Sequence, residues 1–453
     1  MKRILIFFIG IVCASYFVNA QESLSLSDAI QTALQRNYDI LIERGNVEVA
    51  ENNNSWGEAG RLPTVSLNLN QNNALTDNVK VAFPTSTQGQ TVSNQVNPSI
   101  SANWTIFDGF KVNINKKRFE LLQAETEGNA SIVIANTLQS IILGYYLAVL
   151  ERERLDEFEK QLALSRDKFD YIKVKSDLGS AVSTEVLLEE GNYLTDSISY
   201  INQQLAFRNA VRNLNILLAE KNVAKTYVFL DSLNIPDEEY TLEDLRTKML
   251  GENVDLKKQY ISQSVLGQAT KLSYAGRYPT LSLNAGFSEN KNSLDLSNAT
   301  FFTGSGFTDG PNTRLKSTTD TYSANFTLSF TLFNGGKIKR AIKNSIVNER
   351  VGQLRVEELE NSLDKDLLSM LDQYNIRRQL FGINARRENA AAINLSLSEE
   401  KFRNGSINSF DYRDVQNNYL SSSILKLQAA YNLISSKVDL MRLTGGLIQE
   451  YNE

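Results

Sequence analysis

The side chains that could do chemistry in this chain are carboxylates, because its 453 residues include no histidine and a single cysteine, Cys13. Nucleophilic systems that depend on histidine and the usual zinc sites are therefore excluded. A carboxylate-only hydrolase would need two acids facing one another, and Asp364 and Asp366 do not qualify, because residues two apart on a helix point in different directions. The sequence predicts no enzymatic activity, no metal site and no cofactor.

Two glycine turns interrupt the helical pattern of the chain. Gly179 and Gly405 lie 226 residues apart (405 less 179), and both suit the left-handed conformation that ends a helix. Ser183 or Thr184 after the first turn, and Ser409 after the second, are candidates to cap the next helix. The chain is expected to turn back on itself at both places.

Acidic residues follow each turn. Asp411 and Asp414 come after the second turn, and Glu185 holds the place of Asp411 in the first, whereas Leu188 replaces Asp414. A carboxylate in the first turn of a helix is favourable in any protein, so Asp411 also has a purely structural explanation. Arg413 lies between the two aspartates and is a candidate partner for them.

The turns belong to a unit that occurs twice. Residues 60–68 read GRLPTVSLN and residues 276–284 read GRYPTLSLN, a displacement of 216 (276 less 60). In both copies the proline ends the preceding helix, and a strict alternation of apolar and polar residues begins. A second alternating segment follows after a long polar stretch, which is expected to be a loop. The predicted strands are 62–72 and 98–107 in the first copy, and 278–288 and 322–333 in the second.

A very long helical pattern follows each pair of strands. Residues 110–176 and 337–403 contain no proline, and the first carries apolar residues at sevenfold spacing, which is typical of a coiled-coil seam. About 67 residues at about 1.5 Å each give a helix on the order of 100 Å long. Return helices are expected over 183–219 and 409–444. The first repeat is assigned to residues 21–239, the second to 240–446, and a polar tail to 447–453.

The first twenty residues have the features of a secretory signal peptide. Lys2 and Arg3 precede an apolar core and the small-residue cleavage site Val18-Asn19-Ala20. Removal of residues 1–20 leaves a chain without cysteine and takes the formal charge from −5 to −7, since two positive charges are lost. No basic surface for nucleic acid is therefore predicted. Beyond this segment we expect no run of about 18 apolar residues, so no spanning helix is predicted.

Two interpretations of the strands are open. In one, they form ordinary hairpins on a core, with the polar face in water. In the other, they span a membrane, with the apolar face toward lipid and the polar face toward a lumen. Two observations favour the membrane: the signal peptide, and the aromatic residues at the ends of the second strands, as in an interfacial girdle. These aromatic residues are Trp104, Phe107, Phe330 and Phe333.

The number of strands bears on the assembly. Four strands cannot close a barrel, and an open sheet edge in lipid would leave backbone groups unpaired. Eight strands would fill their own interior with side chains, whereas twelve would leave an opening. Three copies of the chain therefore fit best.

The order of elements resembles the TolC family of outer membrane efflux proteins. It runs helix, strand, loop, strand, Phe-Asp-Gly at 107–109 or Phe-Asn-Gly at 333–335, long helix, glycine turn and return helix, all duplicated between about Leu24 and Gly446. The resemblance implies an α+β membrane protein that assembles as a homotrimer. The trimer would have a 12-stranded β-barrel in outer membrane lipid and a 12-helix α-barrel in the periplasm.

The resemblance also implies a function. Similar proteins are passive exit ducts of tripartite efflux pumps or type I secretion systems, and they dock to a periplasmic adaptor and an inner-membrane transporter. By this likeness Asp411 and Asp414, with Glu185 as the equivalent in the first repeat, form an acidic constriction that favours cations. The turns that would contact the adaptor contain Gly179, Ser180, Gly405 and Ser406.

Other protein classes share parts of this pattern. A periplasmic adaptor also has a long helical hairpin, but it would need a lipoyl-like β-domain and would not repeat membrane-type strands. A secreted coiled-coil adhesin is a structural alternative with no channel. Extraction as a heat-resistant trimer that requires detergent would separate a channel from both.

Overall fold

The computed structural model describes residues 22–80, 87–234 and 238–447, so the predicted signal peptide and residues 448–453 of the polar tail lie outside the described residues. The chain divides into two units, and each is built from both repeats. Unit 1 consists of Met1–Arg44, Ala130–Val254 and Glu360–Glu453, and unit 2 consists of Gly45–Asn129 and Asp255–Leu359. The long helices α3 (Lys111–Asp177) and α7 (Lys337–Arg403) contribute residues to both units.

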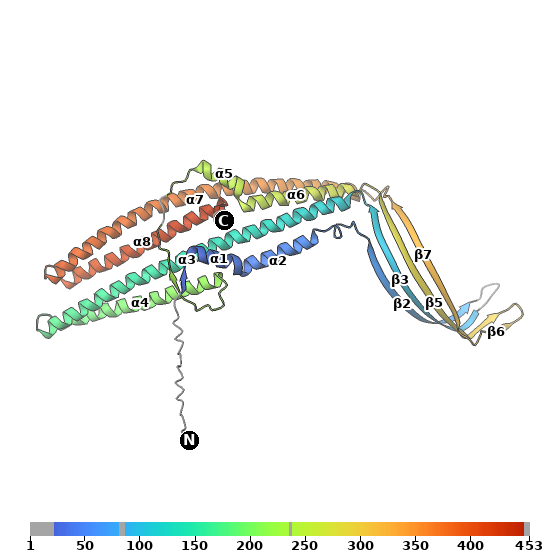
Figure 1. Ribbon diagram of the computed structural model, residues 1–453, viewed down its shortest axis with the longest axis horizontal. Helices are drawn as coiled ribbons and strands as arrows, with labels where there is room; N and C mark the ends of the chain where they lie inside the picture. Colours follow the sequence, from blue (N-terminus) through green and yellow to red (C-terminus); the bar gives the residue numbers. More distant parts are fainter. Residues whose placement is uncertain (1–21, 81–86, 235–237, 448–453) are drawn as a thin grey trace, which may run out of the picture. The chain divides into compact units, whose positions relative to one another are not determined.

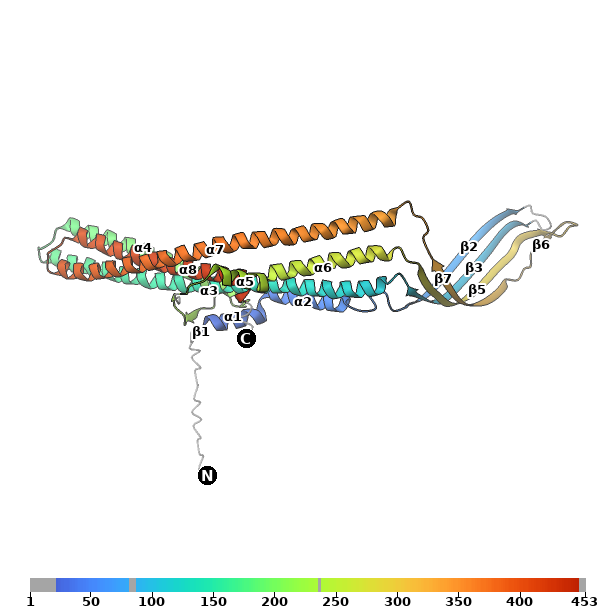
Figure 2. The same ribbon diagram turned by 90° about the horizontal axis from the view of Figure 1, so that it is seen from above.

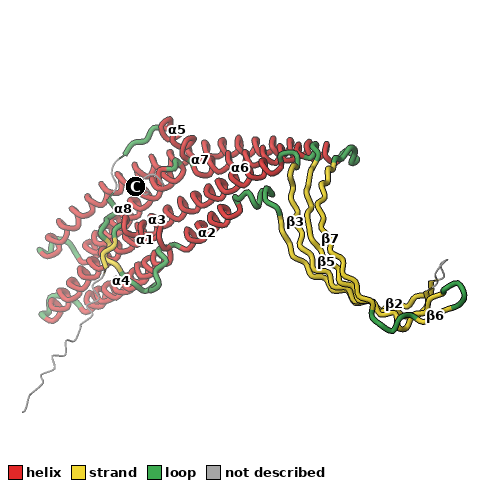
Figure 3. The backbone as a smooth tube through the Cα atoms, turned by 45° about the vertical axis from the view of Figure 1, so that its right-hand side comes forward, coloured by secondary structure: helices red, strands yellow, loops and turns green. Residues whose placement is uncertain are grey.

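Unit 2 contains an antiparallel sheet whose long strands run in the order β2-β3-β5-β7. Their bounds are Thr64–Lys80 for β2, Thr87–Phe107 for β3, Thr280–Phe302 for β5 and Leu315–Ser329 for β7. A short strand, β6 (Phe307–Asp309), pairs with the end of β5. The sheet is a single curved layer, and none of the described helical segments of unit 2 lies over either of its faces (Figures 1 and 3).

The strands extend well beyond the apolar alternation that predicted them. Most of the expected polar loop at 73–95 is strand, because β2 continues to Lys80 and β3 begins at Thr87, and the two pair from Thr64↔Asn103 to Lys80↔Thr87. The strand predicted at 322–333 begins earlier, at Leu315, and ends at Ser329. An antiparallel ladder is held by backbone groups, so it continues wherever neighbouring strands stay paired, whatever the polarity of the side chains.

The register aligns the side chains of the four strands into two different faces. Apolar residues share one face, for example in the row Leu67, Ile100, Phe287 and Tyr322. Small polar residues share the other, for example in the row Ser66, Ser101, Gly286 and Ser323. The apolar side chains are open to the surroundings, with Leu67 79% and Leu328 71% exposed. A continuous exposed apolar face of this kind requires an apolar environment or partner.

Unit 1 is a helical bundle that contains the C-terminal parts of α3 and α7. The return helices are α4 (Ser183–Leu217) and α8 (Ser409–Leu443), and two shorter helices are α1 (Leu26–Arg36) and α5 (Leu242–Glu252). A short parallel pair, β1 (Glu22–Leu24) and β4 (Tyr227–Phe229), was not expected from the sequence. Figure 2 shows α3, α4, α7 and α8 running alongside one another within this unit.

Helix α3 corrects the prediction that no run of about 18 apolar residues exists beyond the signal peptide. Helix α3 does contain an 18-residue window that is long and apolar enough to cross a membrane, although 44% of that window is buried inside the protein. Ile141, Tyr145 and Ala148 of α3 are fully buried in a cluster with residues of α1, α4, β4 and α8. The Tyr145 hydroxyl donates to Asp231 at 2.6 Å and contacts the Leu24 carbonyl at 2.9 Å. These contacts give α3 the role of a core helix.

Buried asparagines break the first helix of each repeat at equivalent positions. Asn37 separates α1 from α2 (Tyr38–Asn53), and Asn253 separates α5 from α6 (Val254–Ala275). The Asn37 side chain donates to the Leu217 carbonyl at 2.8 Å, and Asn253 donates to the Leu443 carbonyl at 2.8 Å. Each asparagine therefore satisfies a carbonyl at the end of its own repeat's return helix, where intrahelical partners run out.

Asn37→Ala is expected to lower the free energy of unfolding by about 1–3 kcal/mol, because it leaves a carbonyl at a largely buried site without its donor. Asn253→Ala should cost a similar amount. Asn52→Ala, at an exposed position of α2, is the matched control and should change stability by less than about 0.5 kcal/mol. Thermal unfolding of the detergent-solubilised protein measures all three, and equal effects would contradict the role given to the buried pair.

Candidate functional site

Helices α3 and α7 both end in glycine turns, which lie together at one end of unit 1 (Figure 1). Gly179 and Gly405 each have φ of 74°, which confirms the predicted left-handed conformation. The backbone N–H of Ser180 donates to the Lys175 carbonyl at 2.7 Å, and Ser406 closes the second turn in the same way. A side chain at either glycine would meet open space, so the backbone conformation, and not crowding, is what favours glycine there.

The caps of the return helices differ from the prediction. Asn408 caps α8, since its side-chain oxygen accepts from the Asp411 N–H at 2.9 Å. Val182 occupies the same position before α4 and makes no side-chain capping bond. The prediction of hydroxyl caps is therefore wrong for Ser183, Thr184 and Ser409.

The predicted constriction residues do not share one environment. Asp411 and Asp414 are exposed on α8, and their spacing of three places them on one side of the helix. Among the described residues neither carboxylate has an ion-pair partner. Glu185 is half-buried on α4, where its negative charge acts on Lys168 of α3. The structure thus separates two free acids from one that faces a cation.

Arg413 is not the partner of these aspartates. Its guanidinium donates to both carboxylate oxygens of Asp196 on α4, at 2.6 and 2.7 Å. Gln161 of α3 donates to the same carboxylate at 3.3 Å, and Gln161 and Asp196 are both buried. Arg413 projects into the bundle while Asp411 and Asp414 stay in solvent, because nearby residues of a helix point in different directions.

A buried ion pair joins α3 to α4 beside the turns, and Ser409 links this pair to α8. The Lys168 ammonium lies 3.1 Å from Glu189, and their side chains are 2% and 1% exposed. Lys168 also donates to the Ser409 carbonyl at 2.8 Å, and the Ser409 hydroxyl donates to Glu189. Burial lowers the pKa of Lys168, and the adjacent Glu189 carboxylate opposes this shift. Ser409, predicted as a helix cap, is thus part of a link between α3, α4 and α8.

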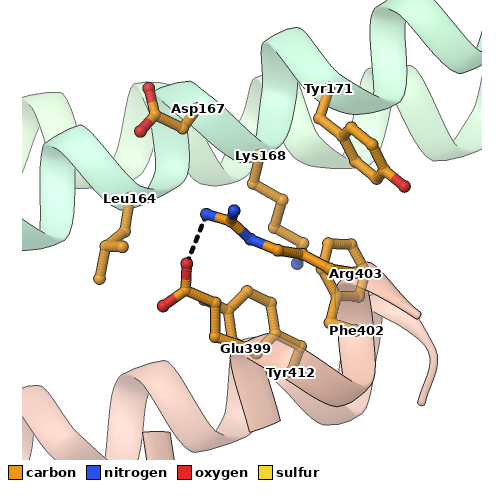
Figure 4. A pocket seen from close by; sticks show the side chains of 8 residues that line it. All are labelled: Leu164, Asp167, Lys168, Tyr171, Glu399, Phe402, Arg403 and Tyr412. Carbon is orange, nitrogen blue, oxygen red and sulfur yellow. Dashed lines mark hydrogen bonds and ion pairs between the residues drawn. The ribbon is translucent and has the colours of Figure 1, made fainter. Parts of the chain in front are cut away.

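The same lysine borders a pocket of about 200 Å³ between α3 and the α7–α8 turn (Figure 4). The rings of Phe402 and Tyr412 stack at 4.8 Å, and the Lys168 ammonium lies 5.5 and 5.6 Å from their centres. Glu399 and Arg403 pair across the pocket wall at 2.6 Å. Lys168, Glu399 and Arg403 each have a partner of opposite charge, and no group of metal-binding residues is found in the described parts of the chain. The pocket offers packing and polar contacts, with no nucleophile and base in place.

The buried polar contacts form a regular series that the sequence analysis missed. Polar residues recur every seven positions on facing helices, so that Lys168 meets Glu189, Gln161 meets Asp196, and Gln203 contacts Glu151 near Arg154. We call this series the polar seam; it comprises Arg154, Gln161 and Lys168 on α3, Glu189, Asp196 and Gln203 on α4, and Ser409, Gln416 and Ser423 on α8. The sequence shows this sevenfold spacing of polar residues, but the coiled-coil prediction rests on apolar residues alone.

Lys168→Met alone should destabilise unit 1 by about 3–5 kcal/mol, because it leaves the Glu189 carboxylate buried without its cation. Lys168→Met combined with Glu189→Leu should recover most of that loss, since apolar residues of similar size need no partner. Thermal unfolding of both variants beside wild type measures the recovery. A double variant no more stable than Lys168→Met would show that the pair is not a coupled unit.

Comparisons with known proteins agree with this architecture. Residues 245–446 match the family model described as outer membrane efflux protein. A search of curated protein sequences finds no match. Solved structures with the same fold include the CmeC outer membrane channel of Campylobacter jejuni, with a TM-score of 0.73 at 14% identity, covering 93% of this chain and 85% of CmeC.

Two further structures cover almost the whole of both chains. A membrane protein from Pseudomonas aeruginosa gives a TM-score of 0.70 at 14% identity over 93% of each chain. The outer membrane protein VceC of Vibrio cholerae gives 0.68 at 12% identity, over 93% of this chain and 96% of VceC. The chain as a whole therefore has the fold of these outer membrane channels, and residues 245–446 have the sequence pattern of the outer membrane efflux protein family.

Proposed function

We propose that three copies of this chain form a passive exit duct in the outer membrane, without enzymatic activity of its own. The duct would serve a tripartite efflux or type I secretion system, in which a periplasmic adaptor and an inner-membrane transporter supply cargo and energy. One observation carries the proposal: the sheet of unit 2 exposes a continuous apolar face, and the long strand at each of its edges is paired on one side only among the described strands.

The apolar face supports a place in lipid. Val65, Leu67 and Leu69 of β2 are all well exposed, and the neighbouring strands continue the same face. Among the described strands, β2 pairs only with β3, and β7 pairs only with β5, so each has one free edge. A free edge in lipid leaves N–H and C=O groups unsatisfied, and joining β2 of one copy to β7 of the next removes every such edge.

The helices of unit 1 support the same joint between copies. Helix α4 and helix α7 each contact α3 and α8, and each carries a stripe of exposed apolar residues. The stripe on α4 consists of Leu187, Leu194, Ile198, Ile201 and Leu205, and the stripe on α7 consists of Ile376, Leu380, Ile383, Ile393 and Leu397. Packing the α4 stripe of one copy against the α7 stripe of the next gives a repeated contact that closes into a ring.

The glycine turns are the proposed entrance from the periplasm. Gly179, Ser180, Gly405 and Ser406 are all exposed and would present backbone and small side chains to an adaptor. Threefold symmetry would gather Asp411 and Asp414 into rings of carboxylates around the pore, which favour cations. Glu185 would contribute less to this constriction, because it is half-buried near Lys168.

The polar seam supports an entrance that opens. Separating an apolar seam exposes hydrocarbon to water, at about 25 cal/mol per Å² of surface. Lys168, Glu189 and Asp196 would instead exchange their partners for water, so the hairpin ends could move apart at lower cost than the apolar core around Tyr145. The closed arrangement would still be specific, because each buried charge needs its own partner.

The joint between copies can be tested at the α4 stripe. Ile201→Asp should convert trimers to folded monomers, since each of three contacts loses about 1.5–3 kcal/mol of apolar burial and gains a charge. Asn202→Asp adds the same charge at the next, exposed position and should leave the trimer intact. Size-exclusion chromatography with light scattering in detergent gives the mass. Trimers that tolerate Ile201→Asp would place the joint elsewhere.

The constriction can be tested by conductance in planar bilayers. Wild type should give a small cation-selective current, and Asp411→Asn with Asp414→Asn should lose most of that selectivity, because the free carboxylates near the entrance are gone. Asp372→Asn, at an exposed acid of α7 away from the turns, is the control and should behave as wild type. A channel whose selectivity is unchanged by the double replacement would support the duct but show that Asp411 and Asp414 do not form its constriction.

A further inference from the structure

Between Thr64 and Asp77 of β2, and along the paired residues of β3, β5 and β7, the charged side chains all lie on one face of the sheet. The described members are Asp77 on β2, Glu289, Lys291 and Asp295 on β5, and Lys316 and Asp320 on β7. The register places Glu289 opposite Asp320 and Lys291 opposite Val96, on the face that carries Leu67 and Phe287. The charges begin where the apolar band ends, and they include ion pairs such as Lys291–Glu289 at 2.9 Å. This face therefore changes from apolar to charged along the strands.

Between Thr64 and Asp77 of β2, and along the residues of β3, β5 and β7 paired in register with this stretch, the opposite face carries no charged side chain. It consists almost entirely of asparagine, glutamine, serine and threonine, as in the row Thr64, Asn103, Asn284 and Asn325. The row with Asn68, Ser99, Ser288 and Thr321 repeats the pattern. Hydroxyls on this face also contact one another, with the Ser66 and Ser101 oxygens 3.1 Å apart. The uncharged character is continuous across four strands that come from both repeats.

This absence of charge is unusual for a face that meets water. Charged residues make up roughly 25–35% of an ordinary soluble surface. The same strands carry charges of both signs on their other face, so charge is missing from the polar face alone. Amides and hydroxyls keep that face wet by hydrogen bonding, and they add no field that would attract or repel an ion.

Resting on the proposed duct, we infer that the strand end of the lumen is an electrically neutral, amide- and hydroxyl-lined wall that passes hydrated cargo of either charge without selection. Selection by charge is then confined to the helical part of the duct, where Asp411 and Asp414 lie. The wall offers hydrogen bonds to any polar cargo, and it repels neither anions nor cations. The duct thus combines a helical part that selects cargo by charge with a strand part that does not.

The test uses single cysteines, because the sequence holds one cysteine, Cys13, within the predicted signal peptide. Asn284→Cys lies on the polar face, and Ala285→Cys, the next residue of β5, lies on the apolar face. The membrane-inserted trimer is treated from outside with a cationic or an anionic methanethiosulfonate reagent of similar size. Mass spectrometry follows the rate of modification, and each rate is divided by that of a small free thiol in solution.

A neutral wall predicts that the two normalised rates at Asn284→Cys agree within about twofold, since the local potential is close to zero. Adding Ser282→Asp, which lies one row away on the same face, should favour the cationic reagent and shows that the assay senses charge. Ala285→Cys should react at least about tenfold more slowly with both reagents, because charged reagents do not enter lipid.

The outcomes separate this inference from the proposed function. A preference of more than about tenfold for either reagent at Asn284→Cys overturns the neutral wall and leaves the duct standing. Fast modification of Ala285→Cys with protection of Asn284→Cys reverses the two faces, and that overturns both the wall and the duct. Conductance of the same cysteine variants before labelling shows whether a channel is present at all.

Discussion

The unpaired backbone groups along the outer edges of β2 and β7 are the constraint on which the proposed assembly depends. In water such edges cost little, since solvent satisfies them. In lipid each unsatisfied N–H or C=O costs several kcal/mol. The exposed apolar face of the sheet favours lipid, and lipid in turn requires that the edges be paired. One chain cannot pair its own β2 and β7 edges, so in the proposed trimer these edges pair with those of neighbouring copies.

In unit 1, residues at sevenfold spacing close the bundle in two different ways. Around Tyr145 the bundle is closed by apolar residues, and next to the glycine turns it is closed by the polar seam. Hydrophobic packing is indifferent to exact partners, whereas Lys168 and Asp196 must each meet one opposite charge. The turns therefore have a specific closed arrangement that water can replace. This combination suits the end of a duct at which partners dock.

Much of the fold follows from the sequence because it rests on local rules. The duplicated GR-x-P-T motif places a strand start in each repeat, and α7 has the bounds 337–403 that its proline-free pattern gives. Gly179 and Gly405 adopt the conformation that only glycine reaches easily. The strand residues at 73–80 and 87–95 could not be predicted by the same rules, because apolar residues such as Leu75 and Val92 are too few there to give a continuous alternation.

The details of the site depended on contacts far apart in the sequence. Arg413 looked like a partner for Asp411 and Asp414, its neighbours in the chain, but it pairs with Asp196, which is 217 residues away. Ser409 looked like a cap, but the neighbouring Asn408 takes that role and frees Ser409 for the buried cluster. Spacing along one helix shows which residues share a face; it does not show which helix that face will meet.

The central claim is that three copies share one barrel by pairing β2 with β7, and electron cryomicroscopy of the full-length protein in lipid nanodiscs tests it most directly. The account predicts threefold symmetry, a closed 12-stranded barrel at the level of the lipid, and a β2–β7 ladder between copies. A monomer, or a trimer whose β2 and β7 edges stay apart while the apolar face lies outside the lipid, would contradict it.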